Sequence, residues 1–101
     1  MIFIFTPVKL DKMRNFRYGM KALHQIEKLL KIKIMNLNLD ELSLYELSVI
    51  LWAGLVHEDV ELTPDKVMDL IDDHSNITDI SQVMGEAFAI AFGGGVNQGK
   101  K

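Results

Sequence analysis

Apolar side chains run almost all round one stretch of the chain, residues 43–56 (SLYELSVILWAGLV), where only Glu46, Ser48 and Gly54 interrupt them after the opening Ser43. Ser43 stands three residues before Glu46, which is the spacing of a reciprocal capping box at a helix N-terminus. A helix that is apolar on every face is normally buried on every face, and about four turns are too few to cross a bilayer. We therefore predict that this stretch is the central helix of a small soluble domain.

The residues before this helix predict β-structure and then a first helix. Residues 8–18 alternate apolar and polar side chains, which predicts a β-hairpin, and residues 1–5 (MIFIF) favour a strand because Ile and Phe suit a pleated surface. From Tyr18 or Gly19 onward, apolar side chains repeat every three or four residues and predict an amphipathic helix of about a dozen residues. Residues 32–39 alternate again, which predicts either a short strand or an extended connector.

Two more helices are predicted after the central one. Thr63-Pro64 is a start signal, with the hydroxyl at the cap and the proline at the first helical position, where its missing N–H costs nothing. The last helix is capped by Asn76 or Thr78, repeats its apolar residues at helical spacing, and reaches Gly93, which is placed to end it as the C′ residue.

The fold class that follows is α+β and mostly α, with a small N-terminal β-hairpin and about four helices packed round a central buried helix. We expect a single domain over residues 1–92 and a flexible Gly-rich tail over residues 93–101. Leu23, Leu51 and Trp52 are predicted to be core residues.

Composition and charge narrow the class of protein. A chain of 101 residues with a formal charge of −3 is one domain without an overall electrostatic footprint for nucleic acid, and it has no cysteine for a disulfide or a thiolate metal site. Its charge is uneven, since residues 9–33 are mainly basic and residues 58–73 mainly acidic. These segments are either two solvated faces or complementary faces through which copies of the chain dock head to tail.

The residue types that carry chemistry form no recognisable site. His24, His74 and the histidine of residues 57–59 (HED) lie on different elements, and consecutive side chains of a loop point different ways, so HED is interpreted as a solvated polar turn. The glycines of residues 93–95 follow a helix, whereas a phosphate-binding loop precedes one. We therefore predict no catalytic, cofactor-binding or metal-binding residue, and no enzyme activity.

The remaining candidates for a functional site are apolar side chains beyond those that a core needs. The chain has six methionines, and Met adapts its shape to varied apolar partners. Met68, Met84, Phe88, Ile90 and Phe92 either fill the core or form a partner-binding surface, along the last helix for the most part, used in helix-in-groove binding or self-association.

Two segments together resemble a known family. They are VKLDKMRNFRYGMKALHQIEKLL and LDELSLYELSVILWAGLVHEDVELTPDKVMDLID, residues 8–30 and 39–72, and they are similar to tail assembly chaperones of long-tailed (siphovirus-type) bacteriophages or prophages. The resemblance extends over roughly residues 8–92, its most distinctive part is LWAGLVHEDVELTPDKVMDLID, and the opening MIFIF has no counterpart in it.

The resemblance implies a non-enzymatic protein without a cofactor. Such chaperones bind the long helical tape measure protein, keep it soluble in the bacterial cytoplasm during assembly, help the tail tube to polymerise round it, and are absent from the mature virion. The resemblance also implies a longer form made by ribosomal frameshifting and, together with the uneven charge, a homo-oligomer. The overall acidity predicts no nucleic-acid partner, and the short apolar stretches predict no membrane partner.

Two functions of other classes compete with the chaperone. The first is a small phage regulatory or DNA-binding helical protein that uses the basic segment, residues 9–33. The second is a hydrolase that relies on His57 and Glu58.

Overall fold

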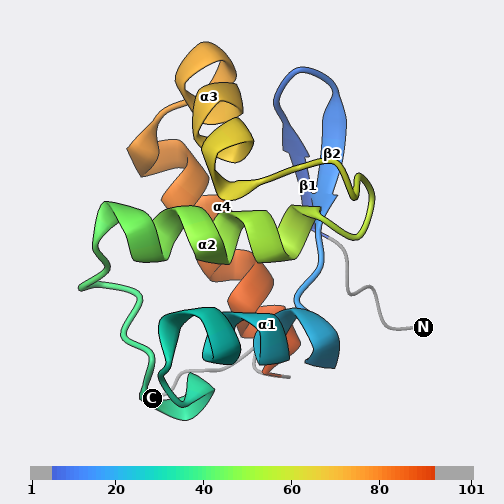
Figure 1. The fold of residues 1–101 in the computed structure, drawn as a ribbon. Helices are drawn as coiled ribbons and strands as arrows, with labels where there is room; N and C mark the ends of the chain where they lie inside the picture. The colour runs from blue at the N-terminus through green and yellow to red at the C-terminus, as the bar shows by residue number, and fades with distance from the viewer. Residues whose placement is uncertain (1–5, 93–101) are drawn as a thin grey trace.

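A two-stranded hairpin followed by four α-helices makes up the described chain, which the computed structural model gives for residues 6–92 (Figure 1). The predicted strand over residues 1–5, the predicted tail over residues 93–101 and the proposed end of the last helix at Gly93 lie outside the described residues. The α+β, mostly α fold class is confirmed. The elements are β1 (Thr6–Lys9), β2 (Met13–Phe16), α1 (Met20–Leu30), the 3₁₀ turn η1 (Ile34–Asn36), α2 (Leu44–Leu55), α3 (Pro64–His74) and α4 (Ile77–Ala91).

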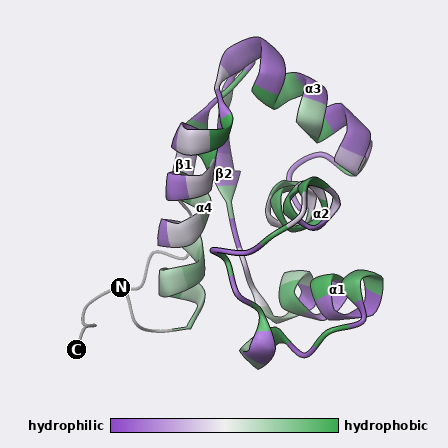
Figure 2. Cartoon of the chain, turned by 90° about the vertical axis from the view of Figure 1, so that its left-hand side faces the viewer, coloured by the Kyte–Doolittle hydropathy of each residue, from purple (hydrophilic) through white to green (hydrophobic). Residues whose placement is uncertain are grey.

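Helix α2 is the centre of the domain, as its apolar sequence predicts. Figure 2 views α2 nearly end-on, with α3 above it, α1 below it, and α4 and the hairpin together on a third side. Most of the side chains of α2 from Ser48 to Leu55 are buried, and they join apolar side chains of the hairpin and the other three helices in one core. The core therefore forms around α2, with each other element covering one of its sides.

The start of α2 has the predicted cap but departs from the predicted burial. Ser43 Oγ accepts the Glu46 N–H at 3.1 Å and Glu46 Oε1 accepts the Ser43 N–H at 2.8 Å, so the capping box is present. The prediction of burial on every face is wrong for the first turn, because Leu44 is 67% and Tyr45 61% exposed. Both side chains line an open hollow between the start of α2 and α3, so no other element covers them.

The three predicted core residues differ in their burial. Leu51 is 2% exposed, whereas Leu23 and Trp52 are half-buried side chains packed against the core. The indole N–H of Trp52 donates to the carbonyl of Leu62 at 2.9 Å, so this ring holds the loop between α2 and α3 against α2. Trp52 therefore lies at the edge of the core, between the core and this loop.

The connection between α1 and α2 contains no strand. Residues 32–39 instead form the single turn η1 between extended residues, and the Ile34 N–H donates to a carboxylate oxygen of Glu27 at 2.8 Å. Of the two predicted alternatives, the extended connector is closer to the observed structure. The alternation arises because Ile34, Leu37 and Leu39 pack half-buried on the core while their neighbours face solvent.

The last two helices begin at caps that the sequence contains. Thr63 Oγ1 accepts the Lys66 N–H at 3.2 Å with proline at the first position of α3. Asn76, rather than Thr78, caps α4, because its Oδ1 accepts the Asp79 N–H at 2.9 Å.

The hairpin is joined to α2 and α4 through aromatic side chains. Its strands pair antiparallel from Thr6 with Phe16 to Lys9 with Met13, so it begins about two residues before the predicted span of 8–18. Phe16 stacks on Tyr18 with ring centroids 6.0 Å apart, and Tyr18 packs on Phe88 of α4 at 4.3 Å. The Tyr18 hydroxyl donates to the carbonyl of Ile50 at 2.7 Å, which fixes the end of the hairpin to α2.

Candidate interaction surface

Exposed apolar side chains gather where the starts of α2 and α4 meet α3. Leu44 and Tyr45 of α2 are 67% and 61% exposed, Ile77 of α4 is 57% exposed, and Met68 of α3 is 39% exposed. Single exposed apolar residues are ordinary on a protein surface, but a contiguous group of them marks an interaction site.

This apolar surface is hollowed into a groove. Two adjoining hollows share Leu44, Ser48 and Met68, and have volumes of about 460 and 190 Å³. The first reaches Tyr45 and the Thr63-Pro64 corner, and the second reaches down to core residues. We call them together the α2–α3 groove, and its apolar lining includes Leu44, Tyr45, Leu47, Met68, Ile71 and Ile77.

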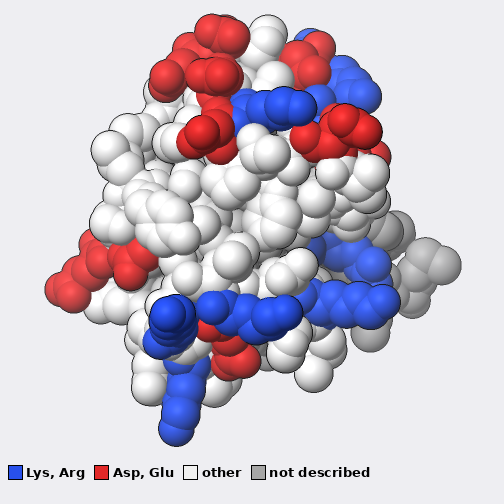
Figure 3. All heavy atoms as spheres, viewed as in Figure 1, with Lys and Arg blue, Asp and Glu red and all other residues white. Residues whose placement is uncertain are grey.

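The charged residues around the α2–α3 groove are acidic. Asp65 and Asp72 of α3 line it, and Asp69 lies on the same face of α3 because these positions are separated by four and three residues. Asp40 and Glu41 are exposed in the segment that enters α2. Figure 3 shows acidic side chains over α3 and beside the start of α2, with uncharged surface between the two groups.

Of the five residues predicted to bind a partner, the structure brings one to this groove and buries two. Met68 lines the groove, whereas Met84 and Phe88 are each 2% exposed in the core. The alternative that they fill the core is therefore the right one for Met84 and Phe88, because their face of α4 is turned towards the hairpin and α2. They cannot contact a partner in this conformation.

The other two predicted residues lie at the far end of α4. Ile90 is half-buried, and Phe92 is 50% exposed with its ring packed edge-on against Phe88, centroids 5.8 Å apart. At 1.5 Å per residue, Phe92 is about 22 Å along α4 from Ile77. The predicted residues consequently do not form one surface.

The HED loop, residues 57–59, holds the hairpin. Glu58 accepts two hydrogen bonds of 3.0 Å, from the backbone N–H and the side-chain amide of Asn15, and His57 Nε2 lies 2.8 Å from the Asn15 carbonyl oxygen. Asp59 is 3.7 Å from the guanidinium of Arg14. The segment is a largely exposed polar turn, as interpreted, but its side chains do not point different ways, since all three meet β2. Their role here is to fix the hairpin, and Arg14 on a predicted strand is the sequence signal that a carboxylate partner is needed.

Asp11 and Glu58 make the hairpin sensitive to acid. The side chain of Arg14 is 6% exposed and binds both carboxylate oxygens of Asp11, at 2.8 and 2.9 Å, which lowers the pKa of Asp11 to about 2. The hydrogen bonds from Asn15 likewise lower the pKa of Glu58. Because both folded-state pKa values lie below those of the unfolded chain, both carboxylates stabilise the fold at neutral pH. The contribution of Asp11 is present above about pH 4 and is lost as the pH falls towards 2.

We therefore predict that acid destabilises the wild-type chain more than a variant that lacks the Asp11 carboxylate. Asp11→Asn is expected to lower the urea midpoint at pH 7, and to show a smaller further decrease between about pH 5 and pH 3 than the wild type. Glu86→Gln, at an exposed position of α4, is the control and should follow the wild type. If the urea midpoints of Asp11→Asn and the wild type fall in parallel as the pH is lowered, the Asp11–Arg14 pair does not contribute to the acid sensitivity.

The basic segment, residues 9–33, does not form one surface. Arg14 is buried against Asp11 in the hairpin, while Lys21, Lys28 and Lys31 are exposed on and just after α1 at the other end of the domain. Figure 3 shows basic side chains near the hairpin and a separate, longer band of them around α1.

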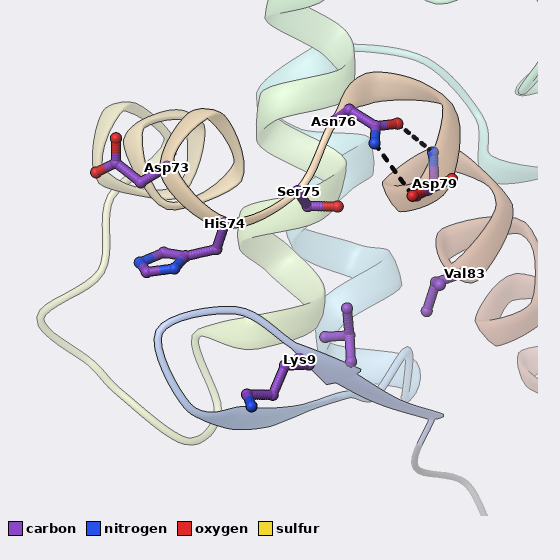
Figure 4. A pocket seen from close by; sticks show the side chains of 8 residues that line it. Lys9, Asp73, His74, Ser75, Asn76, Asp79 and Val83 are labelled. Carbon is purple, nitrogen blue, oxygen red and sulfur yellow. Dashed lines mark hydrogen bonds between the residues drawn. The ribbon is translucent and has the colours of Figure 1, made fainter.

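A separate hollow, between β1 and the junction of α3 with α4, is lined by His74 and Ser75 (Figure 4). Figure 4 shows the His74 ring turned away from the hydroxyl of Ser75 and from Asp79. Asn76 and Asp79 bind each other, with the Asn76 amide N–H donating to the Asp79 carboxylate at 3.1 Å, as the cap of α4. The polar groups of this hollow are thus arranged for helix capping and make no nucleophile–base pair.

No cluster of three or more potential ligands for a metal ion occurs within residues 6–92. None of the helices in this range has the length and apolar character needed to cross a membrane. Comparisons of the chain with models of protein families, with curated proteins and with solved structures gave no match.

Proposed function

We propose that this protein is a phage tail assembly chaperone that binds and solubilises the tape measure protein and assists tail tube assembly. The observation that carries the proposal is the α2–α3 groove, an exposed apolar hollow on a small helical domain. The resemblance of residues 8–30 and 39–72 to such chaperones supports it independently. A non-enzymatic binding protein needs such a surface and no catalytic group.

The physical task of such a chaperone is to cover apolar helical surface before the tail tube does. A long helical protein exposes apolar stripes along its length, and these aggregate unless another apolar surface covers them. A groove on each of many small domains can cover successive stripes and release them as the tube closes. The tail tube protein and a longer frameshifted form of the chain are the further partners of this proposal, and its setting is the cytoplasm of the bacterial host.

The experiment that tests the proposal is co-expression with the tape measure protein encoded by the same phage or prophage. We expect the tape measure protein to become soluble and to co-purify with the chain. If it stays insoluble and unbound with both this chain and a longer frameshifted product, the proposal is wrong. A pull-down with an unrelated small acidic protein provides the control for non-specific solubilisation.

We also propose that copies of the chain associate through their oppositely charged ends. Exposed lysines on and around α1, which include Lys21, Lys28 and Lys31, lie at one end of the domain, and the exposed aspartates of α3 lie at the other (Figure 3). Such a contact joins two different surfaces of the molecule, so it extends to rows of copies of the kind that would cover a rod.

The association is predicted to weaken with salt. Because the contact is between exposed charges, we expect oligomers in sedimentation velocity at about 0.01 M salt and a shift towards monomer at about 1 M, where the screening length falls roughly tenfold. Lys21→Gln with Lys28→Gln should shift the low-salt distribution towards monomer, whereas Met35→Gln, at an exposed apolar position, should not. A monomer at every protein and salt concentration would rule out this association.

A further inference from the structure

We infer that the α2–α3 groove binds one face of a basic amphipathic helix, with apolar side chains seated in its two hollows and Lys or Arg residues beside its acidic edges. The identity of the partner as the tape measure protein rests on the proposed function. The groove and the chemistry of the helix that fits it do not, because they follow from the residues of this chain.

The groove is deep enough to hold a large apolar side chain. The hollow below Met68 reaches the core residues Leu51, Ile71 and Ile80 and has a volume of about 190 Å³, more than the roughly 150 Å³ that admits a benzene molecule. It is therefore large enough for one big aliphatic or aromatic side chain. The neighbouring hollow beside Tyr45 offers a second place, and a helix presents two or three such side chains at i, i+3 or i+4 and i+7.

Helix α3 gives the groove an acidic edge. Asp65, Asp69 and Asp72 lie on one face of this helix and extend over about 10 Å of its length. No lysine or arginine lines either hollow, and the one lysine of α3, Lys66, donates to the carbonyl of Glu61 at 3.1 Å. Like charges placed across an interface are repulsive, so the aspartates disfavour an acidic helix and attract a basic one.

A second copy of this chain is a poorer occupant. Its α1 is the most basic helix of the described chain, but the apolar stripe of α1, with Ile26 fully buried, is turned towards its own α2. To place that stripe in a neighbour's groove, α1 would have to leave its own core. A helix from a different protein needs no such rearrangement, and the acidic edges exclude nucleic acid.

The direct test uses two fluorescently labelled synthetic peptides of about 18 residues, long enough for roughly five helical turns. Both carry leucines at three- and four-residue spacing, one flanked by lysines and the other by glutamates. In anisotropy titrations of the full chain at low salt, we expect the lysine peptide to bind at least tenfold more tightly than the glutamate peptide. Equal binding, or no binding of the lysine peptide, would overturn the inference.

Matched variants locate the binding to the groove. Leu44→Gln with Ile77→Gln changes two exposed groove residues, each at the first position of its helix, where little packing is lost. This double variant should bind the lysine peptide at least tenfold more weakly than the wild type. Met20→Gln with Met35→Gln changes two residues that are 84% and 81% exposed away from the groove, and should leave binding unchanged. Equal losses in both double variants would place binding elsewhere and contradict the inference.

Charge variants test the acidic edges separately. Asp65→Asn with Asp72→Asn should reduce the preference for the lysine peptide severalfold, while Asp73→Asn with Glu86→Gln, which removes the same charge outside the groove, should reduce it much less. Circular dichroism melts of all four double variants confirm that each is folded. An undiminished preference in the Asp65/Asp72 variant would show that these carboxylates do not select the partner.

The same groove variants separate this inference from the proposed function. If the wild type fails to solubilise the tape measure protein but binds the lysine peptide in the groove, the function is wrong and the groove assignment stands. If the wild type solubilises the tape measure protein and Leu44→Gln with Ile77→Gln does so equally well, the function stands and the groove assignment is wrong. Loss of self-association in that variant without loss of peptide binding would identify a second copy as the occupant and overturn the inference.

Discussion

Leu51→Ala is expected to lower the free energy of unfolding by about 2–5 kcal/mol, because it removes most of a side chain from the centre of the core. Leu51 is 2% exposed on the helix that every other layer of the domain contacts. The cavity left behind cannot collapse easily, since α2 is held at its start by the capping box and near its middle by the hydrogen bond from Tyr18 to the Ile50 carbonyl. The loss is a large part of the roughly 5–15 kcal/mol that stabilises a domain of this size.

The control for Leu51→Ala is the same substitution seven residues earlier. Leu44 lies on α2 as well but is 67% exposed, so Leu44→Ala should change the free energy of unfolding by less than about 0.5 kcal/mol. Urea titrations followed by circular dichroism measure both variants on the same scale. Similar values for the two variants would mean that α2 is not the centre of the core.

The positions of the helices could be predicted because their signals are local. The Ser43–Glu46 capping box, the Thr63-Pro64 start and the Asn76 cap each depend on residues three or four apart, and all three are present in the structure. Between such signals, the spacing of apolar residues separates helix from strand. At residues 32–39 this spacing does not decide, because half-buried extended chain and strand share the same alternation.

The α2–α3 groove could not be predicted from the sequence because it is made by three helices. Leu44, Met68 and Ile77 each look like an ordinary apolar position of an amphipathic helix. Whether such a residue is buried depends on where the neighbouring helices end, and that is a tertiary property. The same ambiguity explains why Met84 and Phe88 were considered as partner residues, since residue type alone does not separate a core methionine or phenylalanine from an exposed one.

The contacts of the HED loop could not be predicted for a related reason. Consecutive side chains do point in different directions from an isolated loop, but β2 runs along this loop and meets all three of them through Arg14 and Asn15. Residues more than 40 positions apart in sequence are thereby joined, as Glu58 and Asn15 show. A polar turn next to a strand that carries a buried arginine is better interpreted as a hairpin attachment.

Helix α2 therefore contributes to the fold and to the proposed function with different parts. Its last two turns are buried and determine stability, while its first turn is exposed and forms one wall of the groove. Substitutions at Leu44 should therefore alter binding with little effect on stability. Leu51 lies both in the core and at the floor of the groove, so its substitution should lower stability first of all. The exposed first turn makes the groove testable without unfolding the domain.

Gly54→Ala is the second substitution with a large expected effect, and its cost comes from the close approach of α2 to the hairpin. A Cβ atom at Gly54 would lie 2.6 Å from Cζ of Tyr18 and 2.8 Å from Cδ1 of Phe16, closer than real Cβ contacts allow. Neither ring can move aside freely, because Phe16 is 0% exposed and Tyr18 is held by its hydrogen bond to Ile50 and by Phe88. The hairpin would have to shift away from α2.

We expect Gly54→Ala to lower the free energy of unfolding by about 2 kcal/mol, because overpacking of about 3 kcal/mol exceeds the gain of about 1 kcal/mol in helix propensity. Gly85→Ala is the matched control, since Gly85 lies within α4 and a Cβ there meets nothing within 4 Å. It should stabilise the protein by about 0.5–1 kcal/mol. The change from glycine to alanine is thus predicted to destabilise the protein in α2 and to stabilise it in α4. A Gly54→Ala variant that unfolds at a higher urea concentration than the wild type would show that the hairpin does not lie against α2 in solution.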